Sequence, residues 1–169
     1  MLVSAHVSLG LVNPKSAVNV ASILRAAGCY GVDHVLYTGQ RYRYAKDFNA
    51  DTRAFHKMIP TIGVEDLFEC KPTASKVVVV ELVEGAIPLP EYSHPDNAFY
   101  VFGPEDGSVN ENILSRADDV VYVPTFHCMN LAATANVLLY DRMSKRRYDA
   151  SNERIRQSRD QNNRTRVLS

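Results

Sequence analysis

The chain has 169 residues and a mass of 18.9 kDa, which is the usual size of one domain. Its hydrophobic fraction of 46% and charged fraction of 22% exclude a disordered chain and a fibre, and no apolar run approaches the roughly 20 residues that span a bilayer. The net charge of zero conceals a division. Residues 1–141 hold 10 Lys and Arg against 16 Asp and Glu, whereas residues 142–169 hold 9 against 3. The sequence predicts an acidic body and a basic tail.

The first half of the chain predicts a strand, a helix and a second strand. Residues 3–9 alternate between apolar and mostly polar side chains, as in a strand, and the absence of a basic start argues against a secretory signal. A helix is expected from Asn13 and Pro14, because Asn caps helices and Pro suits their first turn. It should end at Gly28 and Gly31 and lead to a strand over 32–39.

The second half continues the alternation of strands and helices. The β-branched run 76–85 is too short for a helix and predicts a fully buried strand, and a second such strand is expected over 97–103. A helix over 109–116, a strand over 118–124 and a long helix over 129–146 follow. Continuous apolar strands separated by helices predict an α/β fold, a parallel sheet with helices on both faces.

One folded domain over 1–148 is expected, followed by a basic polar tail over 149–169. The tail is rich in Asn, Gln, Ser and Arg, so it buries too little apolar surface to offset its ordering entropy and is predicted to be flexible. An arm that grips phosphates is the alternative for the tail. Three cysteines without a CxxC pair indicate free thiols and a cytoplasmic location.

Several common catalytic motifs are absent. No GxGxxG, GxxxxGK[ST], HExxH or GxSxG occurs, which argues against a dinucleotide fold, a P-loop, a zincin and an α/β-hydrolase. The five histidines have no ligand-like spacing, so no metal is expected.

Three separated segments carry the functional signal: NPKSAVNVASILRAAGCYG at 13–31, FYVFGPEDGSVNENIL at 99–114 and VYVPTFHCMNLAATANVLLYD at 121–141. In order and spacing they resemble the three motifs of the SPOUT superfamily, in particular its TrmH-like RNA 2′-O-ribose methyltransferases, and most closely the short single-domain members that act on tRNA. The resemblance covers about 1–146. It implies a parallel α/β sheet with a C-terminal trefoil knot, S-adenosylmethionine (SAM) as cofactor, and a homodimer.

The resemblance assigns residues to the site one by one. Asn19 and Arg25 match the Asn and Arg of the first motif, and Glu105 matches the Glu of the second. These three are the expected catalytic residues. The expected cofactor-binding residues are Leu82, Gly103, Val123, Cys128, Met129, Asn130 and Leu131.

The chemistry of methyl transfer constrains these roles. The sulfonium of SAM already activates its methyl group, so the protein must mainly align a hydroxyl and help to remove its proton. A guanidinium keeps its proton above pH 12, so Arg25 is expected to orient the hydroxyl and a phosphate. Glu105 or a water would then accept the proton.

RNA binding is predicted from two basic segments. In the first, over 41–57, cations alternate with aromatic rings, as phosphate contact and base stacking require. The second combines the basic cluster at 145–147 with the tail that follows it, and binding through it should weaken steeply with salt. The expected RNA-binding residues are Arg41, Tyr42, Arg43, Lys46, Arg53, Lys145, Arg146 and Arg147. A dimer would supply RNA surface from both subunits.

The chain departs from the family pattern at Ala21, Ser108, Cys128 and Ala132, where Gly or Ser is usual. Methylation of rRNA, or an RNA-binding relative with impaired catalysis, therefore remain the alternatives to tRNA methylation. A flavodoxin-like protein would need a phosphate loop that is absent.

Overall fold

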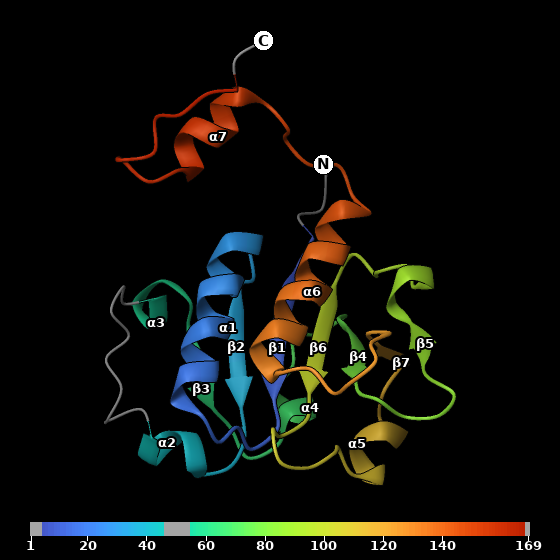
Figure 1. Cartoon of the computed structure of the whole chain (residues 1–169). Coiled ribbons are helices and arrows are strands. Elements are labelled where there is room, and N and C mark those ends of the chain that lie inside the picture. Colours follow the sequence, from blue (N-terminus) through green and yellow to red (C-terminus); the bar gives the residue numbers. More distant parts are fainter. Residues whose placement is uncertain (1–4, 46–54, 168–169) are drawn as a thin grey trace.

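The structure is a computed structural model of the chain that describes residues 5–45 and 55–167 (Figure 1). Within these ranges, seven parallel strands form one sheet in the order β3-β2-β1-β6-β4-β7-β5. The strands are β1 (Val7–Leu11), β2 (His34–Tyr37), β3 (Thr61–Gly63), β4 (Lys76–Val80), β5 (Ile87–Pro88), β6 (Ala98–Phe102) and β7 (Asp119–Tyr122). The helices are α1 (Ala17–Tyr30), α2 (Arg41–Ala45), α3 (Phe55–Met58), α4 (Leu67–Cys70), α5 (Glu111–Ser115), α6 (Leu131–Ser144) and α7 (Asn152–Ser158), and η2 (Leu89–Glu91) is a 3-10 turn.

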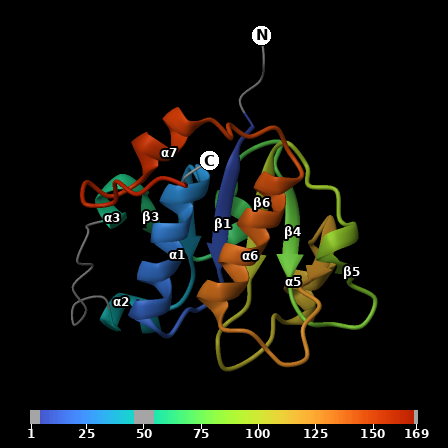
Figure 2. The same cartoon turned by 45° about the horizontal axis from the view of Figure 1, so that its top comes forward.

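Helices cover both faces of the sheet, which confirms the predicted α/β architecture. On one face α1 and α6 pack side by side over β1, β6 and β4, as both views show (Figures 1 and 2). On the other face Leu67 of α4 packs with the alternate side chains of β4 and β6, beside Ile113 and Leu114 of α5. The central strands β1 and β6 are buried at every residue, as expected for strands covered on both sides.

The start of α1 differs from the sequence prediction, whereas its end at Gly31 agrees with it. Asn13 lies outside the helix in a left-handed conformation with φ of 45°, and Ser16 is the N-cap, accepting a hydrogen bond from the Asn19 N–H. The helix runs through Gly28 and ends at Gly31, whose φ of 68° and N–H bond to the Ala27 carbonyl form a left-handed cap. Only glycine adopts this cap without strain, so Gly31 terminates the helix more effectively than Gly28.

The tail also differs from prediction, because it contains α7. Ser151 caps this helix, and an i,i+3 ion pair joins Arg156 to Glu153. None of its residues is buried, and in Figure 1 it lies beyond the ends of α1 and α6. The short strands β3 and β5 were likewise not expected, since their sequences are short and interrupted by polar residues or proline. None of the described helices is both long and apolar enough to cross a bilayer.

A buried arginine holds the end of the sheet where β6 begins. The Arg142 side chain of α6 donates to the carbonyls of Pro95 and Asp96 at 2.6 and 2.7 Å, and to the Tyr100 hydroxyl at 3.0 Å. Burial raises the pKa of Tyr100 to about 12, although Arg142 lowers it. The charged donor therefore satisfies two loop carbonyls that would otherwise be poorly solvated.

Lys145 and His94 extend this contact along the loop before β6. The Lys145 ammonium donates to the Leu89 and Tyr92 carbonyls at 2.6 and 3.0 Å and pairs with Asp141 at 2.7 Å. The His94 ring lies between Asp141 and the Tyr100 hydroxyl, at 2.9 and 2.6 Å. The last turn of α6 is thus bound to the 89–97 loop.

Arg142→Met is expected to lower the free energy of unfolding by about 3 kcal/mol, because it removes charge-assisted bonds from a buried guanidinium to the Pro95 and Asp96 carbonyls and the Tyr100 hydroxyl. Urea unfolding at fixed protein concentration measures the loss. Arg147→Met is the matched control, because the Arg147 side chain is exposed. Equal midpoints for the two variants would contradict a structural role for Arg142.

Candidate functional site

The three sequence motifs meet at the carboxyl ends of the strands. The first motif begins in the loop after β1, the second follows β6, and the third follows β7. Since parallel strands all end at the same edge of the sheet, these loops come together although they are far apart in sequence. The strand order, in which β6 lies between β1 and β4 and β7 lies beyond β4, sets the distances between these loops.

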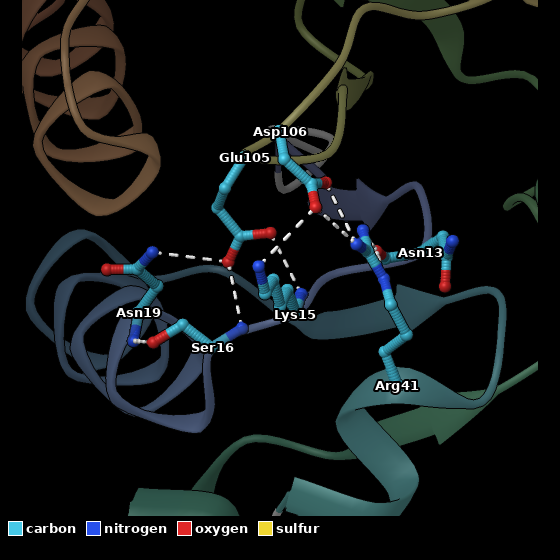
Figure 3. Close-up of polar contacts among 7 residues, drawn as sticks. All are labelled: Asn13, Lys15, Ser16, Asn19, Arg41, Glu105 and Asp106. Atoms are coloured by element: carbon cyan, nitrogen blue, oxygen red, sulfur yellow. Dashed lines mark hydrogen bonds and ion pairs between the residues drawn. The ribbon is translucent and has the colours of Figure 1, made fainter.

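Glu105 is the centre of the contacts between the first two motifs (Figure 3). Its Oε2 accepts the Lys15 N–H at 2.8 Å, and its Oε1 accepts the Ser16 N–H at 3.0 Å and the Asn19 side-chain amide at 3.1 Å. No acidic residue lies in the first turn of α1, so the Glu105 carboxylate supplies negative charge to the positive end of that helix. The FGPE loop is thereby bound to the start of α1.

Asn19 and Asn130 extend the network to the third motif. The Asn130 amide donates to Asn19 Oδ1 at 3.0 Å, while Asn130 Oδ1 accepts the N–H groups of Ala132 and Ala133 at 2.8 and 3.3 Å. Asn130 is therefore the N-cap of α6 and also a contact to α1. One chain of side chains, Glu105 to Asn19 to Asn130, links all three motifs.

A pocket lies between these loops. Asn19 and Glu105 contribute to its wall, together with Glu81 from the end of β4. The structure brings to this pocket all the residues expected to bind the cofactor: Leu82, Gly103, Val123, Cys128, Met129, Asn130 and Leu131. Arg25 does not line it. That residue lies farther along α1 with an exposed side chain.

Gly103 has a steric requirement in this wall. A Cβ built on Gly103 would lie 2.9 Å from Glu81 Oε2, closer than real side chains approach. That oxygen also accepts the Val109 N–H at 3.1 Å, so it cannot readily move. Sequence reasoning did not identify Glu81, because nothing marks a carboxylate at the end of a buried strand as a pocket residue.

The composition of the pocket fits SAM. Carboxylates from Glu81 and Glu105 suit a ligand that carries a sulfonium and an ammonium, and Val123, Met129 and Leu131 give an apolar side for the adenine. Exposed backbone at 103–107 can pair with the polar edge of the base. In the described residues, no group of three or more His, Cys, Asp or Glu side chains is placed to hold a metal ion.

The protonation of Glu105 follows from its contacts. Burial alone raises its pKa, but the hydrogen bonds from Lys15, Ser16 and Asn19 outweigh burial and lower the pKa below the ordinary value. Both oxygens are engaged and the group is a weak base, so the contacts favour a positioning role. Of the two proton acceptors that the sequence leaves open, Glu105 and a water, these contacts favour the water, and a catalytic role of Glu105 stays a prediction.

Two of the residues expected to bind RNA through the first basic segment, Arg41 and Tyr42, make contacts within the protein. Arg41 donates to both carboxylate oxygens of Asp106 at 2.8 Å and to the Asn13 carbonyl (Figure 3). Asp106 is also 3.6 Å from the Lys15 ammonium. Tyr42 is buried, with 9% exposed, and packs edge-on against Tyr37.

These contacts argue against a base-stacking role for Tyr42, whose ring is buried, and give Arg41 an acidic partner with which RNA phosphates would compete; RNA binding by both stays a prediction. Arg43 is exposed, whereas Lys46 and Arg53 lie outside the described residues.

In the second basic segment, too, some of the cationic side chains have partners within the protein and others are exposed. The ammonium of Lys145 is engaged by two carbonyls and Asp141, and Arg146 pairs with Asp96. RNA binding by Lys145 and Arg146 therefore stays a prediction that would compete with these contacts. Arg147 is exposed and remains a candidate for RNA contact.

Comparison with known families and structures identifies this arrangement. The SpoU rRNA Methylase family matches residues 6–140, which include the first two motifs and all but the last residue of the third. The chain belongs to this family. The TrmH-like resemblance is thereby confirmed, and RNA methylation with SAM is the activity that the resemblance implies for a member of the family.

Solved structures share the fold at low sequence identity. A TrmH/SpoU tRNA modifying enzyme of A. aeolicus has 22% identity and a TM-score of 0.73, covering 90% of this chain and 85% of that one. A structure described as giving insights into the 2-OH methylation of C/U34 on tRNA has 17% identity and a TM-score of 0.71, covering 83% of this chain and 91% of that one. AviRb of Streptomyces viridochromogenes, in complex with AdoMet, has 16% identity and a TM-score of 0.69, covering 84% and 61%.

Coverage differs among these structures. The chain spans 62% of the length of AviRb and 57% of an rRNA methyltransferase from Sinorhizobium meliloti. No curated protein matches the chain.

Glu105→Gln is expected to lower the free energy of unfolding by about 1–2 kcal/mol at neutral pH, because a charged acceptor becomes neutral. Since the folded pKa is lowered, the stability due to the carboxylate is present above the ordinary Glu pKa and is lost as pH falls through the folded value. The difference between variant and wild type should therefore shrink at acidic pH. Urea titrations across pH test this, with exposed Glu84→Gln as control. A difference that does not change with pH would contradict the contacts.

Proposed function

We propose that the protein is a SAM-dependent RNA 2′-O-ribose methyltransferase that acts on tRNA. The observation that carries the proposal is the pocket in which the three motifs of the family meet, joined by the Glu105, Asn19 and Asn130 contacts. SAM supplies a methyl group on a sulfonium. The 2′-oxygen bonds to the methyl carbon, the sulfur–methyl bond breaks with its electron pair on sulfur, and the hydroxyl proton passes to water.

The choice of tRNA is supported by the motif resemblance to the tRNA-acting members and by two of the similar structures. The structures described as tRNA modifying enzymes are covered over 85% and 91% of their lengths, whereas the rRNA methyltransferase of S. meliloti is covered over 57%. Methylation of rRNA is the alternative, and the family description names rRNA.

The residues have distinct tasks in this proposal. Backbone at 103–107 and the apolar side chains of the third motif hold the cofactor, and Glu105 and Asn130 position the loops that form its walls. Arg25, which keeps its proton, orients the target hydroxyl and its phosphate. These roles fit a reaction in which alignment supplies most of the rate.

A homodimer is part of the proposal, because Arg25 lies outside the pocket of its own chain. The α1–α6 layer carries exposed apolar residues, Val18 on α1 and Val137 and Tyr140 on α6. A second copy that covers this layer about a two-fold axis would bring Arg25 of one subunit toward the pocket of the other.

The trefoil knot is proposed on the strength of the strand order. The chain passes from β4 through β5 at the sheet edge to β6 on one side of β4 and then to β7 on the other, before α6 returns to pack against α1. This order agrees with the knot that the family resemblance implies. A cytoplasmic location is proposed as well, since Cys29, Cys70 and Cys128 are all unpaired.

The exposed arginines after residue 149 are proposed as an arm for RNA phosphates.

Two measurements test the function. Calorimetry should show that the wild-type protein binds SAM, and mass mapping should find a ribose methyl group in tRNA that is missing when the protein is absent. SAM binding without any missing methyl group in tRNA or rRNA would favour an RNA-binding relative.

Gly103→Val is the matched variant for calorimetry. Its side chain would meet the Glu81 carboxylate, so SAM binding should fall below detection while the fold persists. Ile62→Ala, at an exposed position on β3, should bind SAM as the wild type does. Undiminished binding by Gly103→Val would place the cofactor elsewhere.

Mixed dimers test whether Arg25 acts across the interface. Arg25→Ala and Gly103→Val should each be inactive alone, since one lacks the orienting group and the other the cofactor. Coexpression should restore roughly a quarter of wild-type turnover, because half of the dimers are mixed and each mixed dimer has one complete site.

Methyl transfer to bulk tRNA measures the recovery. No recovery in purified mixed dimers would show that Arg25 serves its own subunit, and full turnover by Arg25→Lys would contradict its orienting role.

A further inference from the structure

Phe126 is the most exposed large hydrophobic side chain in the described part of the protein, with a relative exposure of 101%. It stands in the loop between β7 and α6, where no core residue contacts it. Single exposed apolar side chains are common on protein surfaces and need no explanation by themselves. The position of this ring relative to the pocket sets it apart.

The loop presents the ring at the rim of the pocket. Thr125 and Cys128, on either side of Phe126, both line the pocket. The Thr125 hydroxyl donates to the His127 carbonyl at 2.7 Å and closes a tight turn with Phe126 at its apex. The ring is therefore carried by a fixed loop and does not belong to a mobile end of the chain.

The neighbours of Phe126 suit a flat ligand better than a protein surface. Thr125, His127 and Cys128 are all exposed as well, and none of them extends an apolar patch. The core of a protein interface gathers several apolar side chains, as the α1–α6 layer does. A lone ring among polar groups offers a planar face, and unstacked RNA bases bind such faces.

We propose that Phe126 is the platform on which a nucleobase of the substrate RNA stacks, beside the ribose that enters the pocket. The inference rests on the proposed function and adds a base-contacting residue to it. Stacking on an aromatic side chain contributes about 1–3 kcal/mol per base, which corresponds to about a 5- to 150-fold change in affinity. The contact tolerates different bases, because every base has a π-face.

The test compares a short oligouridylate with an abasic oligomer of the same length and charge. Fluorescence anisotropy at one salt concentration gives the affinity of each for the full-length protein. The wild type should prefer the oligouridylate, and Phe126→Leu, which keeps an apolar side chain but has no ring, should lose about 5- to 150-fold on it. Phe126→Trp should retain the preference. Neither change should affect the abasic oligomer or SAM binding.

Three outcomes would overturn the inference. Equal affinity of Phe126→Leu and wild type for the oligouridylate would exclude stacking. An equal loss on both oligomers would assign the effect to the phosphates or to the fold. A change from dimer to monomer in sedimentation would assign the ring to a second copy of the chain. Failure of the proposed function is a separate result, since it would appear as absent SAM binding by the wild type or as no missing ribose methyl group in tRNA and rRNA.

Discussion

The arrangement of the pocket depends on one carboxylate placed at the positive end of a helix. Glu105 accepts two backbone N–H groups at the start of α1 and the amide of Asn19, and so fixes the loop after β6 relative to the helix after β1. Asn130 then joins the loop after β7 to the same helix. Because β4 separates β6 from β7, this last contact makes the chain pass over the end of β4 and encloses the pocket there.

Because of these hydrogen bonds, few side chains of the pocket are free to take part directly in proton transfer. A carboxylate that already accepts three hydrogen bonds is a poor proton acceptor, and an asparagine that caps a helix cannot turn toward a substrate. The side chains that are most recognisable in the sequence therefore hold loops in place. What they hold is backbone, which can match an adenine edge and a bent cofactor without any particular side chain. A departure such as Cys128 in place of serine then alters the wall of the pocket without disturbing the bonds that shape it.

The sequence predicted the sheet and the pocket well because both follow from local patterns. Buried strands such as 97–103 have a recognisable composition, and a motif keeps its residues together wherever its strand ends. What it did not indicate are partners that are distant in sequence. Arg41 and Asp106 are 65 residues apart, and nothing local indicates that they pair. Tyr42 was assigned to the surface by its charged neighbours, although its ring packs on Tyr37. The sequence analysis did not single out Phe126, because the exposure of its side chain and its place beside the pocket are visible only in the structure.

The length of α6 relates the two ends of the molecule. The helix begins at the pocket with its Asn130 cap and ends after 14 residues at the buried Arg142 and Lys145 contacts, a rise of about 21 Å. The arginine-rich tail therefore leaves the body at the far end of a rigid rod, well away from the cofactor loops. An RNA that touched both would have to reach along one whole side of the protein. A large folded RNA is long enough to reach both places. A fragment that holds little more than the modified nucleotide would contact the pocket alone.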